Sequence, residues 1–498
     1  MKFCERIFLL FLPIIPFLCH GQEATLHKDD VLALTIGDAV DIARRQSPDI
    51  LVSRHGFRSS YWNYTYYKAN YLPSLTLTSR PNFYHQINVV NLPDGASQYV
   101  EQNQLITDGA LSVTQNIPWT GGSVSVETGL QRLDLYGDAR SSTYKSNPVI
   151  VSYSQSLFGY NSLKWDRKIE PLRYEEAKKN YVEALELVAA QTILKFFNLA
   201  RAQTNLNIAK TNYANADTLY TFAKGRYNIG TITENEMLQL EVNRLNEESN
   251  MLNAQIEVDD YMQELRYYLG ITDKQEIEVA IDDDVPQFSV SLEEALVMAS
   301  ENSPDIINMK RRKLESESNV AYAKSLSGFK ADLFAQLGLT QTGSVLDAAY
   351  KNPFNQQYVE LGVRLPILDW GRAKGRIRVA KSNRDMVYTQ VEQNMTNFEL
   401  NVTKVVKQFN LQINRVNVAA KTDRTANRRN DVARRLYILG QSTILDLNAA
   451  ISEKDTAKRN YINCLYNYWS LYYTLRSLTL YDFEKNRPLT EDYDLLLK

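Results

Sequence analysis

The clearest candidates for chemistry are a tyrosine, a glycine, a threonine and an acid that recur in one pattern. The spacing Tyr-x-x-Gly-x-x-Thr-x-x-acid occurs at Tyr227, Gly230, Thr233 and Glu236, and again at Tyr437, Gly440, Thr443 and Asp446. A glycine can take the left-handed conformation that ends a helix, and a threonine three residues before an acid is typical of a capping box. Structure alone can therefore explain both copies. If the chain forms an oligomer, the repeated acids would also ring an opening and favour cations there.

Catalytic chemistry is not indicated. The chain has 4 histidines, and none follows His85, which leaves no plausible Ser-His-Asp arrangement outside the N-terminal segment. The sequence contains no phosphate-binding glycine loop and no Cys/His spacing typical of a metal site. We therefore expect no enzyme activity, no catalytic residue, no cofactor and no metal.

Composition narrows the classes further. The 498 residues are 23% charged, with a mean hydropathy of -0.37, which argues against a bundle of transmembrane helices. The charges, 56 basic against 58 acidic, indicate no nucleic-acid partner. An apolar run at 7–18 behind a basic start predicts a signal peptide over 1–21, and the bulky Leu18 disfavours lipidation of Cys19. Its removal would leave Cys464 alone, so we expect an exported chain without a disulfide.

The chain contains an internal duplication. Residues 34–50 align with 290–306, and both segments end in Ser-Pro-Asp-Ile, while the tip pattern recurs later in each copy. Each copy predicts two short helices, alternating strands, a very long helix, a glycine turn and a return helix. We expect a signal peptide at 1–21, a first repeat at 22–270, a linker at 271–289, a second repeat at 290–482 and a C-terminal tail at 483–498.

Several segments alternate between apolar and small or polar residues. They lie at 74–78, 149–157, 333–340 and 359–365. The alternation suits strands with lipid on one side and water on the other, and it suits a soluble sandwich equally well. Two more alternating runs flank the turn at 118–122, which predicts an inserted hairpin at about 105–135. Whether this hairpin joins a barrel or folds over its rim stays open at this point.

The number of strands has a consequence. One chain offers four clear strands, or six with the insert, whereas membrane barrels have at least eight. An open sheet edge cannot lie in lipid, because its amides would lack hydrogen-bond partners. If these strands cross a membrane, several copies must share one barrel.

The predicted helices are long and pack closely. Residues 163–226 contain no helix breaker beyond Pro171, and alanines recur every seventh residue at 202, 209, 216 and 223. A seam with alanine in every rung lets neighbouring helices approach closely in a coiled coil. The predicted fold class is mainly α with membrane β: two internal repeats, a transmembrane β-barrel shared between several copies and a long α-helical coiled coil.

These features resemble the TolC-type outer-membrane efflux channel family. The resemblance is carried by the two Ser-Pro-Asp-Ile helices, by LPILDWGR at 365–372 and by the turns YNIGTIT and YILGQST. It implies a homotrimer with twelve barrel strands and a twelve-helix tunnel, in the outer membrane of a Gram-negative bacterium and extending into the periplasm. It also implies contact with outer-membrane lipid, a periplasmic adaptor protein and an inner-membrane transporter.

The resemblance also assigns residues. It implies adaptor-contacting tips at Gly230, Thr231, Gly440 and Gln441, and periplasmic gate acids at Glu236 and Asp446. Ser442 departs from the family, which often has a basic residue there, so a salt-bridge lock on the gate is in doubt. The expected function is a passive export channel fed by the pump. The alternatives are a non-conducting periplasm-spanning coiled-coil scaffold or adhesin, and a monomeric porin. The exported substrate cannot be read from the sequence.

Overall fold

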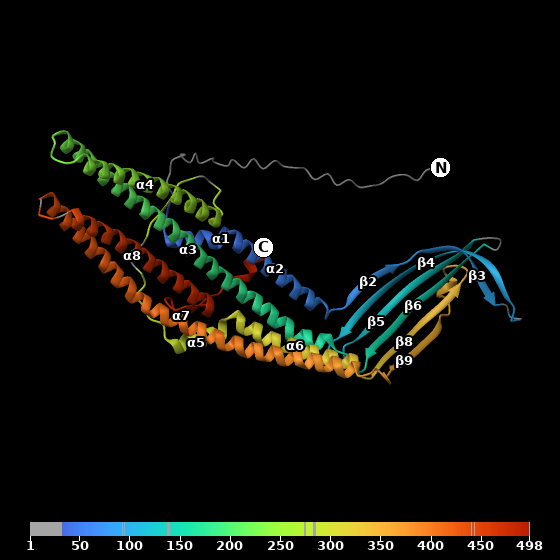
Figure 1. Cartoon of the computed structure of the whole chain (residues 1–498). Coiled ribbons are helices and arrows are strands. Elements are labelled where there is room, and N and C mark those ends of the chain that lie inside the picture. The colour runs from blue at the N-terminus through green and yellow to red at the C-terminus, as the bar shows by residue number, and fades with distance from the viewer. Residues whose placement is uncertain are drawn as a thin grey trace, which may run out of the picture.

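The protein is an elongated molecule with helices at one end and a single large sheet at the other (Figure 1). The structure, a computed structural model, describes residues 32–91, 93, 95–136, 140–272, 275–281, 285–439, 441–442 and 444–497. The expected signal peptide at 1–21, Cys19, Gly440 and Thr443 lie outside these described residues. Among the described residues, no helix is both long enough and apolar enough to span a membrane.

The helices of the two copies match one another in order and length. The first copy has α1 (Ile36–Gln46), α2 (Pro48–Ala69), α3 (Ser162–Asn228) and α4 (Glu234–Leu269). The second has α5 (Leu292–Asn302), α6 (Pro304–Ser327), α7 (Arg372–Ile438) and α8 (Ile444–Thr479). Both long helices have 67 residues and both return helices have 36. The predicted duplication is therefore confirmed in the structure.

Local chemistry explains where these helices begin. The Ser47 hydroxyl accepts a hydrogen bond from the Ile50 amide, and the Ser303 hydroxyl accepts one from the Asp305 amide, with a proline at the next position in both helices. The long helices use other caps. The Asn161 side chain accepts from the Lys164 amide at 2.9 Å, and the Asp369 carboxylate accepts from the Ala373 amide at 2.7 Å.

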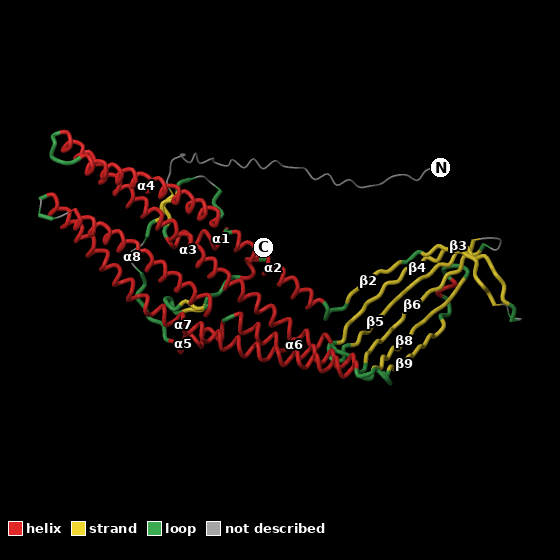
Figure 2. The backbone as a smooth tube through the Cα atoms, in the orientation of Figure 1, coloured by secondary structure: helices red, strands yellow, loops and turns green. Residues whose placement is uncertain are grey.

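The large sheet contains the strands that join the helical segments. They are β2 (Ser74–Ser79), β3 (Asn82–Asn91), β4 (Ser97–Ile117), β5 (Gly122–Tyr136), β6 (Ser141–Ser156), β8 (Lys330–Gly343) and β9 (Phe354–Arg364). The order is β2-β4-β5-β6-β8-β9, with every neighbouring pair antiparallel. β3 continues beside the first half of β4, beyond the end of β2. The sheet of one chain is open, with β2 and β9 at its ends (Figure 2).

The core follows the alanine seam. Ala202 is fully buried, Ala209, Ala216 and Ala223 are at most 8% exposed, and Ala419 in α7 is 3% exposed. Small side chains at these positions let α3 and α7 pack closely against their return helices α4 and α8. The prediction of a close-packed coiled coil is confirmed.

Short elements surround the middle of the helical part. β1 (Leu32–Leu34) pairs in parallel with β7 (Ile277–Val279), which lies inside the segment that the sequence suggested as an aperiodic linker. Near the C-terminus come β10 (Tyr481–Asp482), β11 (Arg487–Pro488) and α9 (Tyr493–Leu496). A short 3-10 helix, Ala348–Tyr350, lies between β8 and β9. β1 and β10 contact the helices, whereas the 3-10 helix packs on β6 and β8 of the large sheet.

Candidate functional sites: the helix tips and the exposed sheet

The tip of the first helical hairpin is built around Gly230. Its φ of +74° lies in the left-handed region, and a side chain at this position would meet open space. The Thr231 amide then bonds back to the Arg226 carbonyl at 2.9 Å, which closes the end of α3. The return helix starts with the expected capping box, because the Thr233 amide donates to the Glu236 carboxylate at 3.0 Å and the Glu236 amide donates to the Thr233 hydroxyl at 3.3 Å.

The second tip has the same closing bond. The Gln441 amide donates to the Leu436 carbonyl at 2.9 Å, as Thr231 does to Arg226 in the first tip. Gln441 is exposed, and the Ser442 hydroxyl donates to the Asp446 carboxylate at 3.4 Å. The structure thus brings Gly230, Thr231 and Glu236 together at one tip, and Gln441 and Asp446 at the other. Gly440 and Thr443 are not part of the described chain.

Both tips carry exposed apolar side chains that the sequence reasoning missed. Ile229 directly precedes Gly230 and is 74% exposed, and Leu439 directly precedes Gly440 and is 68% exposed. About two helical turns before Ile229 in α3, the Phe222 side chain is 69% exposed. The signal was in the sequence, since both tip motifs have an aliphatic residue immediately before the glycine. The two turns thus expose an aliphatic side chain at equivalent positions.

One face of the sheet is apolar and exposed. Register places Leu75, Val113, Val126, Val151 and Leu337 side by side across five strands. All five side chains are between 41% and 66% exposed, although four of them sit on strands with neighbours on both sides. The opposite face carries small and polar residues, for example Ser112 opposite Glu127. Such a two-sided sheet has the pattern of a barrel wall with lipid outside and water inside.

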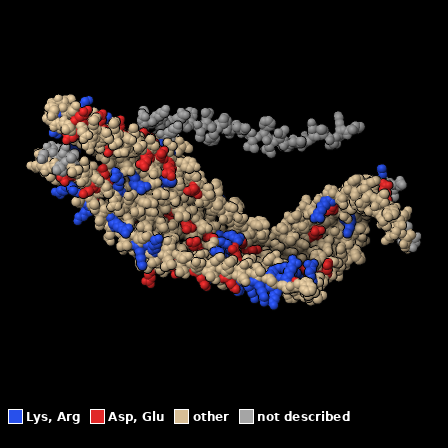
Figure 3. Space-filling model, in the orientation of Figure 1, with Lys and Arg blue, Asp and Glu red and all other residues tan. Residues whose placement is uncertain are grey.

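Aromatic and aliphatic side chains collect where the sheet meets the helices. Trp119 in the β4–β5 turn is 82% exposed, and Trp370 just before α7 is 89% exposed, as is Ile367 at 94%. α7 begins with the basic residues Arg372, Lys374, Arg376 and Arg378. In the view of Figure 3, basic side chains gather near this junction, while most of the sheet surface carries no charge. Exposed tryptophan and basic residues next to an apolar strand band are typical of a membrane interface.

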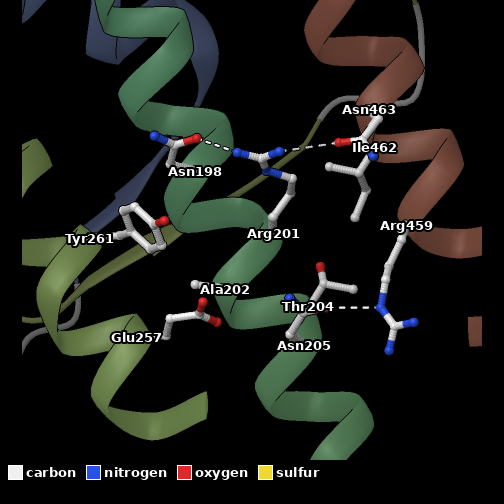
Figure 4. A pocket seen from close by; sticks show the side chains of 10 residues that line it. All are labelled: Asn198, Arg201, Ala202, Thr204, Asn205, Glu257, Tyr261, Arg459, Ile462 and Asn463. Atoms are coloured by element: carbon white, nitrogen blue, oxygen red, sulfur yellow. Dashed lines mark hydrogen bonds between the residues drawn. The ribbon is translucent and has the colours of Figure 1, made fainter. Parts of the chain in front are cut away.

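A polar groove lies between α3, α4 and α8, halfway along the helices (Figure 4). Its volume is about 330 Å³. Arg201 donates to Asn198 and, at 3.4 Å, to Asn463, while Arg459 donates to Asn205 at 3.1 Å. The arginines thus bond to neutral amides, and the bonds to Asn463 and Asn205 join the two helical hairpins across the groove. In the described part of the chain no cluster of three His, Cys, Asp or Glu side chains could hold a metal ion.

Known structures share this architecture. The Campylobacter jejuni CmeC outer membrane channel is 15% identical, with a TM-score of 0.65, covering 92% of this chain and 88% of the other. VceC of Vibrio cholerae is 14% identical, with a TM-score of 0.61 over 89% of this chain and 95% of the other. The Neisseria gonorrhoeae MtrE channel in its open state is 14% identical, with a TM-score of 0.61 over 92% and 91%. At such identities the likeness shows the fold, that of an outer-membrane channel.

A separate comparison, with a family model, shows the family to which the chain belongs. The family model for the outer membrane efflux protein matches residues 123–271 and 295–479, together more than half of the chain. The chain therefore belongs to the outer membrane efflux protein family, a family of channels and not of enzymes. Its place is the outer membrane, with the helices reaching into the periplasm, and its function is efflux. A search among curated proteins finds no significant match.

Proposed function

We propose that three copies of this chain form a passive conduit for export across the outer membrane and the periplasm. The observation that carries the proposal is the open sheet, which has one exposed apolar face and leads directly into the two helical hairpins. A helix of 67 residues is about 100 Å long at roughly 1.5 Å per residue. That length suits a tunnel wall across the periplasm.

The need for several copies follows from hydrogen bonding. β2 and β9 end the sheet and each has only one strand neighbour within the chain. In lipid the unpaired amides and carbonyls of such edges would each cost several kcal/mol. Pairing β9 of one copy with β2 of the next removes both edges. Three copies also bring together twelve long and return helices, the number that the family resemblance implies for the tunnel.

The tips are the proposed contact with a periplasmic adaptor, which in turn joins an inner-membrane transporter. Gly230 leaves open space above the backbone, and Ile229 and Leu439 expose apolar side chains beside the turns. Small, open turns flanked by apolar groups suit close approach by a partner's own hairpin. The supporting feature is that both tips of one chain have the same closing hydrogen bond and expose the aliphatic residue before the turn.

Glu236 and Asp446 are the proposed acids at the periplasmic mouth. Glu236 also closes its capping box, and Asp446 accepts from Ser442, so each carboxylate has a structural contact as well. In a trimer, three copies of each acid would surround the mouth and attract cations. Because Ser442 carries no charge, a salt bridge from this position cannot lock the gate.

Single-channel recording in planar bilayers tests the conduit. We expect the purified protein to conduct ions, and a non-conducting scaffold would pass no current. Glu236→Gln keeps a side chain that can complete a capping box, so it removes charge with little change in fold. Cations bound at the mouth should block the current. Near a wet surface each lost charge weakens cation binding by roughly 1 kcal/mol, so the cation concentration that halves the current should rise about fivefold in Glu236→Gln and Asp446→Asn.

Asp260→Asn, an exposed acid on α4 far from the tip, is the matched control and should leave the block unchanged. If both tip variants are blocked as strongly as the parent protein, the acids do not line the mouth. If the protein conducts ions but cations do not block the current, the proposed conduit is supported and only the proposed ring of acids is ruled out.

Tip docking is tested by Gly230→Asn, because asparagine tolerates the left-handed conformation better than most residues. We expect export to fail while the oligomer and its conductance persist, since the new side chain obstructs a partner and not this chain. Gly225→Asn is the control, because Gly225 also faces open space but lies within α3. Normal export by Gly230→Asn would show that the glycine only ends the helix.

A further inference from the structure

We propose that the β4–β5 hairpin is part of the barrel wall, so that each subunit supplies six strands and the trimer encloses eighteen. This inference rests on the proposed trimeric conduit, and it differs from the twelve strands that the family resemblance implies. The hairpin is the segment that the sequence marked as an insert at about 105–135, without showing whether it joins the barrel. Its location in the structure answers that question in four independent ways.

The first observation is pairing on both sides. β4 pairs with β2 from Ser74↔Thr114 to Ser79↔Gly109, and β5 pairs with β6 from Ser123↔Ser154 onward. Between them β4 and β5 pair along their lengths, from Asn103↔Tyr136 to Ile117↔Gly122. The hairpin therefore separates β2 from β6 inside one continuous sheet. A hairpin folded over the rim or into the lumen would leave β2 and β6 as neighbours.

The second observation is the continuity of both faces. The apolar row Leu75, Val113, Val126, Val151 and Leu337 crosses the hairpin without interruption, and Val113 and Val126 are 41% and 43% exposed. The other face stays small and polar through the hairpin, where the partners are Thr76↔Ser112, Ser112↔Glu127 and Ser125↔Ser152. A wall segment needs one lipid-facing and one water-facing side, and the hairpin has both.

The third observation is how the hairpin is fixed at the helix end of the sheet. On one side, the side-chain amide of Gln115 donates to the Tyr71 carbonyl and the side-chain amide of Asn116 donates to the Asn70 carbonyl, both at 3.0 Å. On the other side, the side-chain amide of Asn161 donates to the Pro118 carbonyl at 3.0 Å, and the side-chain amide of Gln155 donates to the Thr120 carbonyl at 2.9 Å. The turn is thus tied to the end of α2 and to the start of α3.

The geometry of this turn leaves little freedom. Gly121 has a φ of +78°, and an added Cβ would lie 2.9 Å from the Asn161 side chain. Trp119, in the same turn, is 82% exposed and lies at the same end of the sheet as Trp370. Both tryptophans suit the aromatic belt that marks a membrane interface on barrel proteins. The turn therefore sits at the end of the sheet where the other strands join the helices.

The fourth observation is length and direction. β4 has 21 residues and β5 has 15, whereas a tilted strand needs about 9 to 11 residues to cross a membrane. Because each subunit supplies an even number of antiparallel strands, β2 runs away from the helices and β9 runs back toward them. β9 of one copy then runs antiparallel to β2 of the next, as closure of an antiparallel barrel requires.

The consequence is a wider exit. With strands about 4.8 Å apart and tilted by about 40°, eighteen strands enclose a backbone diameter of about 36 Å, against about 24 Å for twelve at the same tilt. The circumference grows 1.5-fold while the tunnel keeps its helices. The outer opening is then wider than a barrel of twelve strands would leave.

Site-directed spin labelling tests the inference on the full chain in liposomes, in a background without the other cysteines. Val126→Cys and Ser125→Cys probe the two faces of the hairpin, and Leu361→Cys and Glu360→Cys probe the faces of β9, which belongs to the wall in either arrangement. Each label's accessibility to oxygen, which concentrates in lipid, is compared with its accessibility to a water-soluble nickel complex. We expect residue 126 to match 361 and residue 125 to match 360, with oxygen-to-nickel ratios about tenfold apart between faces.

The outcomes separate this inference from the proposed function. If labels at 125 and 126 are both accessible to the nickel complex while 361 faces lipid, the hairpin lies outside the wall, and the inference fails while the conduit stands. If the label at 361 also faces water, the sheet does not cross a membrane, and both proposals fail. Electron microscopy of the purified trimer gives a second measure: eighteen strands around the barrel support the inference, and twelve overturn it.

Discussion

Replacing Arg476 with methionine should remove a large part of the stability of the helical region. The guanidinium donates to Glu186 at 2.7 Å and to Asp482 at 2.6 Å, and both acids are at most 3% exposed. Removing one partner of a buried ion pair typically costs 3–5 kcal/mol, because a charge stays buried without compensation. Two features reduce the cost here: Arg44 also bonds to Glu186, and Asp482 accepts from the Glu484 amide. We therefore expect a loss of about 3 kcal/mol.

Denaturant titration of the detergent-solubilised protein, followed by far-ultraviolet circular dichroism, measures this loss. Arg173→Met is the matched control: Arg173 also bonds to two acids, Glu170 and Glu315, but its side chain is 50% exposed, so the cost should stay below about 1 kcal/mol. Adding Glu186→Gln and Asp482→Asn to Arg476→Met should recover part of the loss. Equal losses in Arg476→Met and Arg173→Met would show that burial of the ion pair does not set the loss of stability.

Two further substitutions test single positions. Burial and the nearby charge of Asp305 raise the pKa of Glu183 to about 7 from its ordinary 4.5, so the folded chain binds an extra proton between these values and loses stability as pH rises through this window. Glu183→Gln should stabilise the protein by about 1–2 kcal/mol at pH 8 and by little at pH 4, measured by denaturant titration at both. Gly270 caps α4 with a φ of +68°, and an added Cβ would lie 2.8 Å from the Gln46 carbonyl oxygen. Gly270→Ala should therefore lower the free energy of unfolding by about 2 kcal/mol, measured by denaturant titration. Gly225→Ala, on the open surface of a helix, should leave this free energy unchanged or raise it. Equal effects of the two substitutions would contradict this prediction.

Much of the helical part could be predicted from the sequence because its determinants are local. Ser47 and Ser303 before a proline mark helix starts, and the structure has both caps. The alanine spacing indicates close packing, and the seam around Ala202 is buried. Gly230 was expected to end a helix in the left-handed conformation, which its φ confirms. Each of these signals depends on residues within one or two turns of each other.

The remaining features depend on contacts between distant segments. Alternation in β4 and β5 indicates which residues share a face, but not which strands are neighbours, so the place of the hairpin could not be predicted. It depends on side chains such as Gln115, which bonds to the backbone just after α2, and Asn161, which bonds to the hairpin turn. The buried Arg476–Glu186 pair joins residues from different repeats, and no local pattern announces it.

The sheet of one chain is open, and we propose that other copies complete it. Native mass spectrometry of the detergent-purified protein tests it most directly, because the mass counts the copies in the folded particle. We expect a particle of three chains that separates into single chains only on unfolding. A stable, folded, single chain inserted in the outer membrane would contradict it.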